Sequence, residues 1–136
     1  MRIALLVSEF NWDVTSRMLE VAQERAEQLH LEISQTCRVP GAFDMPLVAD
    51  ALLRRDDVDG VVTLGAIIRG QTRHDEVISH AVANSLAILS TTHQKPVSLG
   101  ISGPGTKRHA YARIRPVSER AVEAVLKVSE QIRGMQ

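Results

Sequence analysis

Near its start the chain reads Ile3-Ala4-Leu5-Leu6-Val7, a continuous apolar run between Arg2 and Ser8. A strand that is apolar at every position is buried on both faces, unlike one in which apolar and polar residues alternate. Strand character recurs in residues 32–39, 61–64 and 96–101. Because longer helical patterns separate these runs, the order of elements predicts a parallel sheet with helices on both of its faces.

The segments between the strands have apolar residues at helical spacing. The first helix is expected to end near His30, and Asp13 or Thr15 can cap its start. Further helices are expected over residues 46–53, 72–91, 108–113 and 118–133, with Pro116 separating the last two. Loops are expected over residues 65–71 and 102–105, where glycine and proline gather.

Length and composition restrict the class of protein. The 136 residues fit a single domain, and the sixteen basic and sixteen acidic residues cancel, which argues against a dedicated nucleic-acid binder. No apolar run approaches the ~20 residues that span a bilayer, and the first run is too short for a signal peptide. Cys37 is the single cysteine, so it has no partner for a disulfide. We therefore expect a cytoplasmic protein with neither a membrane nor a nucleic-acid partner.

In parallel sheets, ligands bind beyond the carboxyl ends of the strands. The segment after the third expected strand, residues 65–74, has glycines around a loop that opens a helix at Gln71-Thr72. Free N–H groups at such a helix start can bind an anion such as phosphate. His74 lies in the expected first turn, and its imidazole can exchange protons near neutral pH. A capped helix with an exposed histidine accounts for the same residues without a ligand.

The first two strand exits offer an aromatic ring and a carboxylate. Phe10 follows the first strand, where a flat ring suits stacking on a planar heterocycle, although packing against the next helix explains it equally well. Trp12 allows the same two interpretations. Asp44 follows the second strand and can accept hydrogen bonds from ligand hydroxyls, but an Asp just before Pro46 more often caps a helix.

Two other patterns fail on detail. Residues 100–107 nearly match a P-loop, but the last two residues are in the wrong order and Pro104 lacks an N–H. His74 and His80 would face different directions on a helix, which argues against a metal site.

Four arginines suit either phosphate recognition or a solvated helix face: Arg108, Arg113, Arg115 and Arg120.

Three blocks in this order resemble the lumazine synthase family, and the match covers almost the whole chain. They are Glu9-Phe10-Asn11, Val39-Pro40-Gly41-Ala42-Phe43-Asp44-Met45-Pro46-Leu47 and Leu64-Gly65-Ala66-Ile67-Ile68-Arg69-Gly70-Gln71-Thr72-Arg73-His74. Residues 73–76 and 100–105 look most like the archaeal branch. The resemblance implies a flavodoxin-like fold, a three-layer α/β sandwich whose four-stranded parallel sheet has the strand order 2-1-3-4.

The resemblance also implies a transferase of riboflavin biosynthesis that needs no metal or organic cofactor. Members of the family condense 5-amino-6-(D-ribitylamino)uracil with 3,4-dihydroxy-2-butanone 4-phosphate to 6,7-dimethyl-8-ribityllumazine, releasing phosphate and water. By position, His74 would transfer protons. The pyrimidine and its ribityl chain would be bound by Phe10, Ala42, Phe43, Asp44, Ala66, Ile67, Ile68 and Leu99, and the phosphate by Gln71, Thr72 and Arg113.

In the family, the residues matching Leu99 and Arg113 reach into the pocket of the adjacent subunit. The resemblance therefore implies a homopentamer with shared sites, and it leaves open whether pentamers build an icosahedral capsid. Two departures from the family pattern are Asp44, often Glu, and Leu99, often Phe. One alternative is the related archaeal-type riboflavin synthase, which the intact phosphate loop disfavours. The other is a flavin- or lumazine-binding shell protein without activity.

Overall fold

A four-stranded parallel sheet with the order β2-β1-β3-β4 forms the centre of the computed structural model, which describes residues 1–136. The strands are β1 (Arg2–Ser8), β2 (Glu32–Val39), β3 (Gly60–Ile68) and β4 (Val97–Gly105). The two central strands are buried along almost their whole length, as a continuous apolar run predicts. The predicted strand order and the flavodoxin-like α/β architecture are confirmed.

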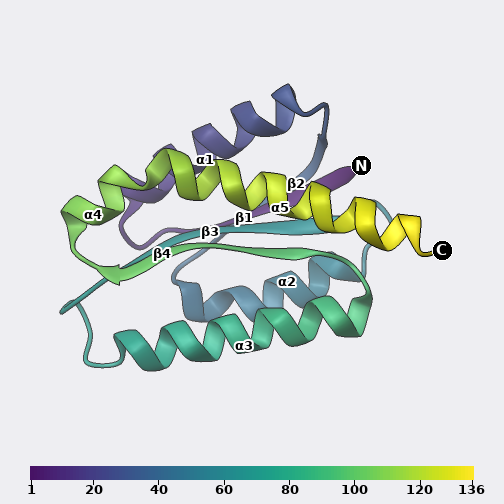
Figure 1. Cartoon of the computed structure of the whole chain (residues 1–136). Coiled ribbons are helices and arrows are strands. Elements are labelled where there is room, and N and C mark those ends of the chain that lie inside the picture. Colours follow the sequence, from purple (N-terminus) through teal and green to yellow (C-terminus); the bar gives the residue numbers. More distant parts are fainter.

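Helices cover both faces of the sheet (Figure 1). On one face lie α1 (Trp12–Gln28), α4 (Lys107–Ala112) and α5 (Ile114–Gly134), and on the other the short η1 (Ala42–Asp44), α2 (Met45–Leu53) and α3 (Asp75–His93). Successive side chains of a strand point to opposite faces, so β1 contributes to two cores. Leu5 packs with Met18 and Val122 on the α1 and α5 side, whereas Leu6 packs with Met45 on the α2 side. No helix combines the length and the apolar character needed to cross a membrane.

The two expected glycine-containing loops are mostly strand, so those predictions were wrong. β3 continues to Ile68, and β4 continues to Gly105. The two strands stay in register at Ala66↔Ser102 and, after an irregularity, at Ile68↔Gly105. Pairing satisfies the backbone groups of both segments, and this outweighs the weak strand preference of glycine. The stretch that resembles a P-loop is therefore largely part of the sheet.

The third helix begins later than expected, at Asp75 instead of Thr72. A turn precedes it, in which the His74 N–H donates to Thr72 Oγ1 at 3.1 Å and the Gly70 N–H donates to Asp75 Oδ2 at 2.9 Å. Gly70 has φ +89°, a conformation that a side chain would disfavour. His74 consequently occupies the N-cap position of α3. The prediction that it lies in the first turn of the helix was wrong.

The starts of the first and last helices also differ from the predictions. Asn11, with φ 61°, holds the N-cap position of α1, and neither Asp13 nor Thr15 caps it. The Thr15 hydroxyl is buried without a hydrogen-bond partner. α5 begins at Ile114 and not at Ser118, because Pro116 lies in its first turn, where the missing N–H breaks no helical bond. Arg113 marks the junction between α4 and α5.

Candidate active site

A cavity of about 650 Å³ opens beyond the carboxyl ends of β1, β2 and β3. It lies beside the boundary between β1 and β3, the point at which strand order reverses and ligands bind in open parallel sheets. Its volume is within the range of small-molecule sites. The residues that line it are Phe10, Asn11, Gly41, Ala42, Phe43, Asp44, Ala66, Ile67, Ile68, Gln71, Thr72 and Ile78.

Two exposed aromatic rings stand at this cavity. The side chains of Phe10 and Phe43 are each 67% exposed, so neither ring belongs to the core, and the packing explanation for Phe10 is wrong. The Phe10 N–H donates to the Pro40 carbonyl at 2.9 Å, which ties the first strand exit to the second. A Cβ placed on Gly41 would come within 2.8 Å of Phe10 Cδ2. Glycine at position 41 therefore leaves room for the ring.

Trp12 has the structural role instead. As the first residue of α1 it is partly buried against the core, and it does not line the cavity. The guanidinium carbon of Arg38 lies 4.1 Å from the centre of its ring, a cation–π contact. Arg38 also pairs with Glu9, whose carboxylate is 3.2 Å away. These contacts fix the chain on either side of Phe10.

Asp44 closes the turn at the second strand exit. Its Oδ2 accepts the N–H of Gly41 at 3.0 Å, and its side chain does not cap α2, the role that is commoner for an Asp at this position. The carboxylate remains exposed at the rim, and Oδ1 makes no hydrogen bond within the chain. Asp44 can thus accept a hydrogen bond from a ligand hydroxyl while it shapes the turn.

The end of β3 forms another wall of the cavity. Pairing of β1 with β3 ends at Val7↔Leu64, so β1 does not cover the backbone of the residues that follow. The carbonyl of Ala66 accepts Asn11 Nδ2 at 3.1 Å. Ala66, Ile67 and Ile68 therefore present both an apolar surface and backbone groups to the cavity.

The turn before α3 contains the free amides that an anion site requires. The Gly70 and His74 N–H groups have acceptors within the turn, and the Gln71 N–H makes only a long contact of 3.4 Å to Ile68 O. The N–H groups of Thr72 and Arg73 donate to no atom of the chain. Of these residues, Gln71 and Thr72 line the cavity, so their amides, in the turn before the helix, are the ones available to an anion there.

All the predicted site residues line the cavity except His74, Leu99 and Arg113. His74 is exposed at the start of α3, and Leu99 is 54% exposed on β4, which is an edge strand. Arg113 is exposed at the α4–α5 junction. One chain therefore assembles the predicted pyrimidine and ribityl contacts apart from Leu99, together with part of the predicted phosphate site.

Three residues of the cavity had no predicted role: Asn11, Gly41 and Ile78. Asn11 and Gly41 stand next to predicted residues in the motif blocks, and both are residue types that tolerate unusual turns. This is a signal that sequence reasoning could have used. Ile78 lies one helical turn after His74, and only the packing of α3 shows that it reaches the cavity.

An ionic cluster fixes α4 against the start of α1. Asp13 accepts hydrogen bonds from Lys107 Nζ at 2.9 Å and from the Tyr111 hydroxyl, while the Arg17 guanidinium lies 5.8 Å from the Tyr111 ring centre. The bonds from Lys107 and Tyr111 lower the pKa of Asp13. The bond to Asp13 raises the pKa of Tyr111. Through α4 this cluster holds the segment that leads to Arg113.

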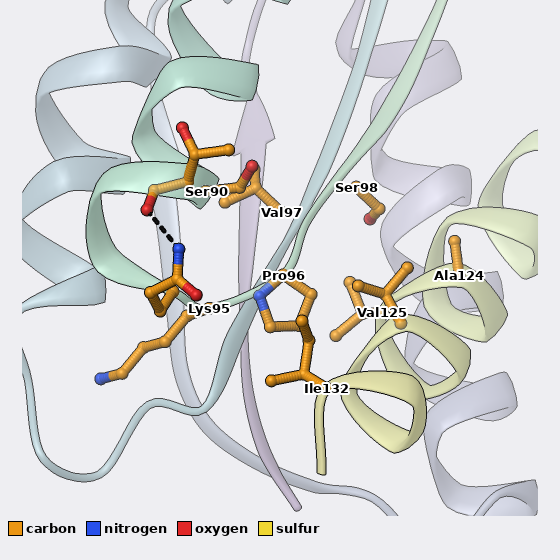
Figure 2. Close-up of a pocket in the computed structure, with 11 residues that line it drawn as sticks. Ser90, Lys95, Pro96, Val97, Ser98, Ala124, Val125 and Ile132 are labelled. Carbon is orange, nitrogen blue, oxygen red and sulfur yellow. Dashed lines mark hydrogen bonds between the residues drawn. The ribbon is translucent and has the colours of Figure 1, made fainter. Parts of the chain in front are cut away.

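A second hollow, of about 310 Å³, lies at the opposite end of β4 (Figure 2). It is bounded by Pro96 just before the strand, by Val97 and Ser98 on it, and by Val125 and Ile132 on α5. None of the predicted site residues lines it. Because it lies at the amino end of its strand, it is away from the edge where parallel sheets bind ligands.

The fold and the cavity define a flavodoxin-like α/β protein with a cavity at the point where strand order reverses. A family model described as 6,7-dimethyl-8-ribityllumazine synthase matches residues 1–136. The protein of that name from Metallosphaera sedula is 47% identical over 135 residues, which cover 98% of this chain and 89% of the relative. Those from Pyrobaculum arsenaticum and Saccharolobus solfataricus are each 45% identical, over 131 and 135 residues, and cover 96% and 98% of this chain and 87% and 88% of their own. The chain belongs to the 6,7-dimethyl-8-ribityllumazine synthase family.

Proposed function

We propose that this chain condenses 5-amino-6-(D-ribitylamino)uracil with 3,4-dihydroxy-2-butanone 4-phosphate to 6,7-dimethyl-8-ribityllumazine. The observation that carries this proposal is the composition of one cavity. It combines an exposed ring, a turn with a carboxylate, and a second turn with free backbone amides. A planar pyrimidine, a polyhydroxyl chain and a phosphate match these three features in turn. Membership of the family supports the same reaction.

The pyrimidine substrate would occupy the part of the cavity between the first two strand exits. Phe10 stacks on its ring, and the backbone of residues 66–68 contacts its edge. Ala42, Phe43 and Asp44 hold the ribityl chain, with the Asp44 carboxylate accepting hydrogen bonds from hydroxyl groups. Asp44 is one methylene shorter than the Glu frequent in the family, so its ribityl contact would lie closer to the turn.

The phosphate substrate would lie against the turn before α3. The Thr72 N–H, which has no acceptor in the chain, donates to the phosphate, and the weakly held Gln71 N–H can turn toward it. Arg113 adds a guanidinium, which matches phosphate in shape and charge. Phosphate binding at this turn orients the ketone toward the pyrimidine.

The reaction requires placement more than strong acid–base chemistry. The amine of the uracil attacks the ketone, a Schiff base forms with loss of water, phosphate is eliminated, and the ring closes with loss of a second water. Holding two substrates side by side removes translational and rotational entropy from the barrier. His74, beside Thr72 in the turn, transfers protons, a contribution of about 10²–10⁴-fold.

The active unit in this proposal is a homopentamer with shared cavities. Leu99 and Arg113 lie outside the cavity of their own chain, on the edge strand β4 and after α4. An apolar side chain that is 54% exposed on an edge strand is favourably covered by another chain. Leu99 and Arg113 of one subunit would complete the cavity of its neighbour.

Absorbance assays with both substrates, and with added lumazine alone, test this function against its alternatives. Formation of the lumazine, followed by its absorption band, is the expected outcome. Formation of riboflavin from added lumazine would instead indicate a riboflavin synthase. Binding of lumazine or flavin with no turnover of either kind would indicate a shell protein.

A further inference from the structure

A reciprocal pair of side-chain amides crosses one side of the cavity. Asn11 Nδ2 donates to Gln71 Oε1 at 3.2 Å, and Gln71 Nε2 donates to Asn11 Oδ1 at 3.1 Å. Asn11 Nδ2 also donates to the Ala66 carbonyl at 3.1 Å. This pair joins the exit of β1 to the turn that follows β3, two segments that lie 60 residues apart in the chain.

The Asn11 side of the pair is anchored by the backbone. Asn11 has φ 61° and ψ 46°, a left-handed conformation that asparagine tolerates better than most residues. Its carbonyl accepts the N–H groups of Val14 at 2.8 Å and Thr15 at 2.9 Å, which fixes it at the start of α1. Because Phe10 is the preceding residue, the Asn11 amide has a set position relative to the stacking ring.

The Gln71 side of the pair has few other constraints. Its backbone N–H makes only the 3.4 Å contact to Ile68 O, and the residue is exposed. The side-chain amide therefore provides the shorter hydrogen bonds that hold this residue. Thr72, which would donate to the phosphate, follows directly. A shift of Gln71 would displace the Thr72 N–H with it.

We propose that the Asn11–Gln71 amide pair is a positioning device that sets the distance between the stacked pyrimidine and the bound phosphate. The inference rests on the proposed function, because it concerns the placement of those two substrates. Neither amide touches the reacting atoms, and both are neutral at every pH at which the protein is folded. The pair contributes by keeping the amine and the ketone in register, so its loss reduces kcat more than it weakens the binding of either substrate.

The test compares Gln71→Ala, Asn11→Gly and the double variant in the lumazine assay. Glycine at position 11 adopts the left-handed conformation without strain, so Asn11→Gly removes the amide and keeps the backbone. We expect each single variant to lower kcat about tenfold and to change the KM of each substrate less than threefold. The double variant should be no slower than the slower single variant, because both substitutions break one interaction. The pH profile of kcat should be unchanged.

Gln28→Ala is the matched control. Gln28 also uses its amide, accepting a hydrogen bond from Arg25 at 2.9 Å, but it lies at the far end of α1 outside the cavity. This control should retain the wild-type kcat. Thermal unfolding of every variant distinguishes misplaced substrates from an unfolded protein. If Asn11→Gly does not fold, the kcat of Gln71→Ala tests the positioning role.

Different results would overturn the proposed function and the positioning role of the amide pair. If wild-type protein forms no lumazine, the proposed function is wrong, and the inference that rests on it is overturned as well. If wild type is active and Gln71→Ala has an unchanged kcat, only the positioning role is overturned. A rise in the KM of the phosphate substrate at constant kcat would also overturn it, because the turn would then bind phosphate without setting the register. Effects that multiply in the double variant would show that the two amides act separately.

Discussion

The carboxylate of Asp75 accepts the N–H of Gly70 at 2.9 Å, so the first residue of α3 closes the turn that precedes its own helix. Asp75 is only 8% exposed, and its Oδ1 is buried with no hydrogen-bond partner. The protein therefore places a buried carboxylate behind the turn proposed to bind phosphate. This bond joins the start of α3 to Gly70, whose φ of +89° lies in the region that favours glycine.

Removal of this acceptor should destabilise the protein. Asp75→Ala leaves the Gly70 N–H without its partner, and we expect the free energy of unfolding in urea to fall by about 1–3 kcal/mol. Asp75→Asn keeps an oxygen that can accept the same N–H, so it should cost clearly less. Equal losses in the two variants would show that the Gly70 bond is not what stabilises the turn.

The exposed ring of Phe10 should contribute to binding and not to stability. Phe10→Ala removes a side chain that is 67% exposed, so the unfolding midpoint should hardly change. Loss of stacking should raise the KM of the uracil substrate about tenfold. Leu47→Ala is the control, since Leu47 is 79% exposed and does not line the cavity. A KM effect of the same size in both variants would exclude stacking as its cause.

His74 should be important but not essential for turnover. Because most of the acceleration is assigned to placing the substrates, His74→Ala should lower kcat by about 10²-fold and leave activity that is still measurable. The KM of both substrates should change little. His93→Ala is a comparison at the other end of α3, where His93 pairs with Asp50. Steady-state kinetics that show full kcat in His74→Ala would remove the imidazole from the mechanism.

Shared cavities predict that two defective variants complement each other. Arg113→Ala should raise the KM of the phosphate substrate, and Phe10→Ala that of the uracil. When the two variants are unfolded together and refolded, some cavities should combine an intact Phe10 with an intact Arg113 of another chain. The mixture should then exceed the mean activity of the separately refolded variants at low substrate. Activity equal to that mean would indicate that each chain works with its own Arg113.

The ionic cluster at α4 predicts a visible titration. Tyr111 is the single tyrosine, and its bond to Asp13 raises its pKa, so tyrosinate absorption should appear at a higher pH in the folded than in the urea-unfolded protein. A raised folded-state pKa means that this contribution to stability is complete below the unfolded-state pKa and is lost as the pH rises through the folded value. Asp13→Asn should move the titration down. An unchanged titration in Asp13→Asn would place the cause elsewhere.

The same cluster gives a prediction for acid. Hydrogen bonds from Lys107 and Tyr111 lower the pKa of Asp13, so its contribution is present above the unfolded-state pKa and is lost as the pH falls through the folded one. Wild-type protein should therefore lose stability in acid more steeply than Asp13→Asn. Parallel acid curves for the two proteins would contradict this assignment. The unfolding midpoint as a function of pH provides the measurement.

Much of the site could be predicted because it follows the strand exits. Phe10, Asp44 and residues 66–68 occupy one cavity, since the carboxyl ends of parallel strands meet at one edge of a sheet. The turn before α3 was harder to predict. Residues 71–74 have nothing in their spacing that forbids a helix, but the hydrogen bonds accepted by Thr72 and Asp75 belong to a turn, and the helix begins only at Asp75. The amide pair of Asn11 and Gln71 joins distant segments, so no local pattern indicates it.

The apolar runs and helical spacings by themselves determined the layers of the sandwich, because burial on two faces of a strand or one face of a helix is encoded residue by residue. The motif blocks determined the family. Only the tertiary structure decided where glycine-containing segments remain strand, which amides are left free, and which predicted residues lie outside their own cavity. The strand extensions depend on pairing between β3 and β4, the free amides on which acceptors Thr72 and Asp75 supply within the turn, and the positions of Leu99 and Arg113 on how the elements pack. A backbone group is paired only where the fold places a partner beside it.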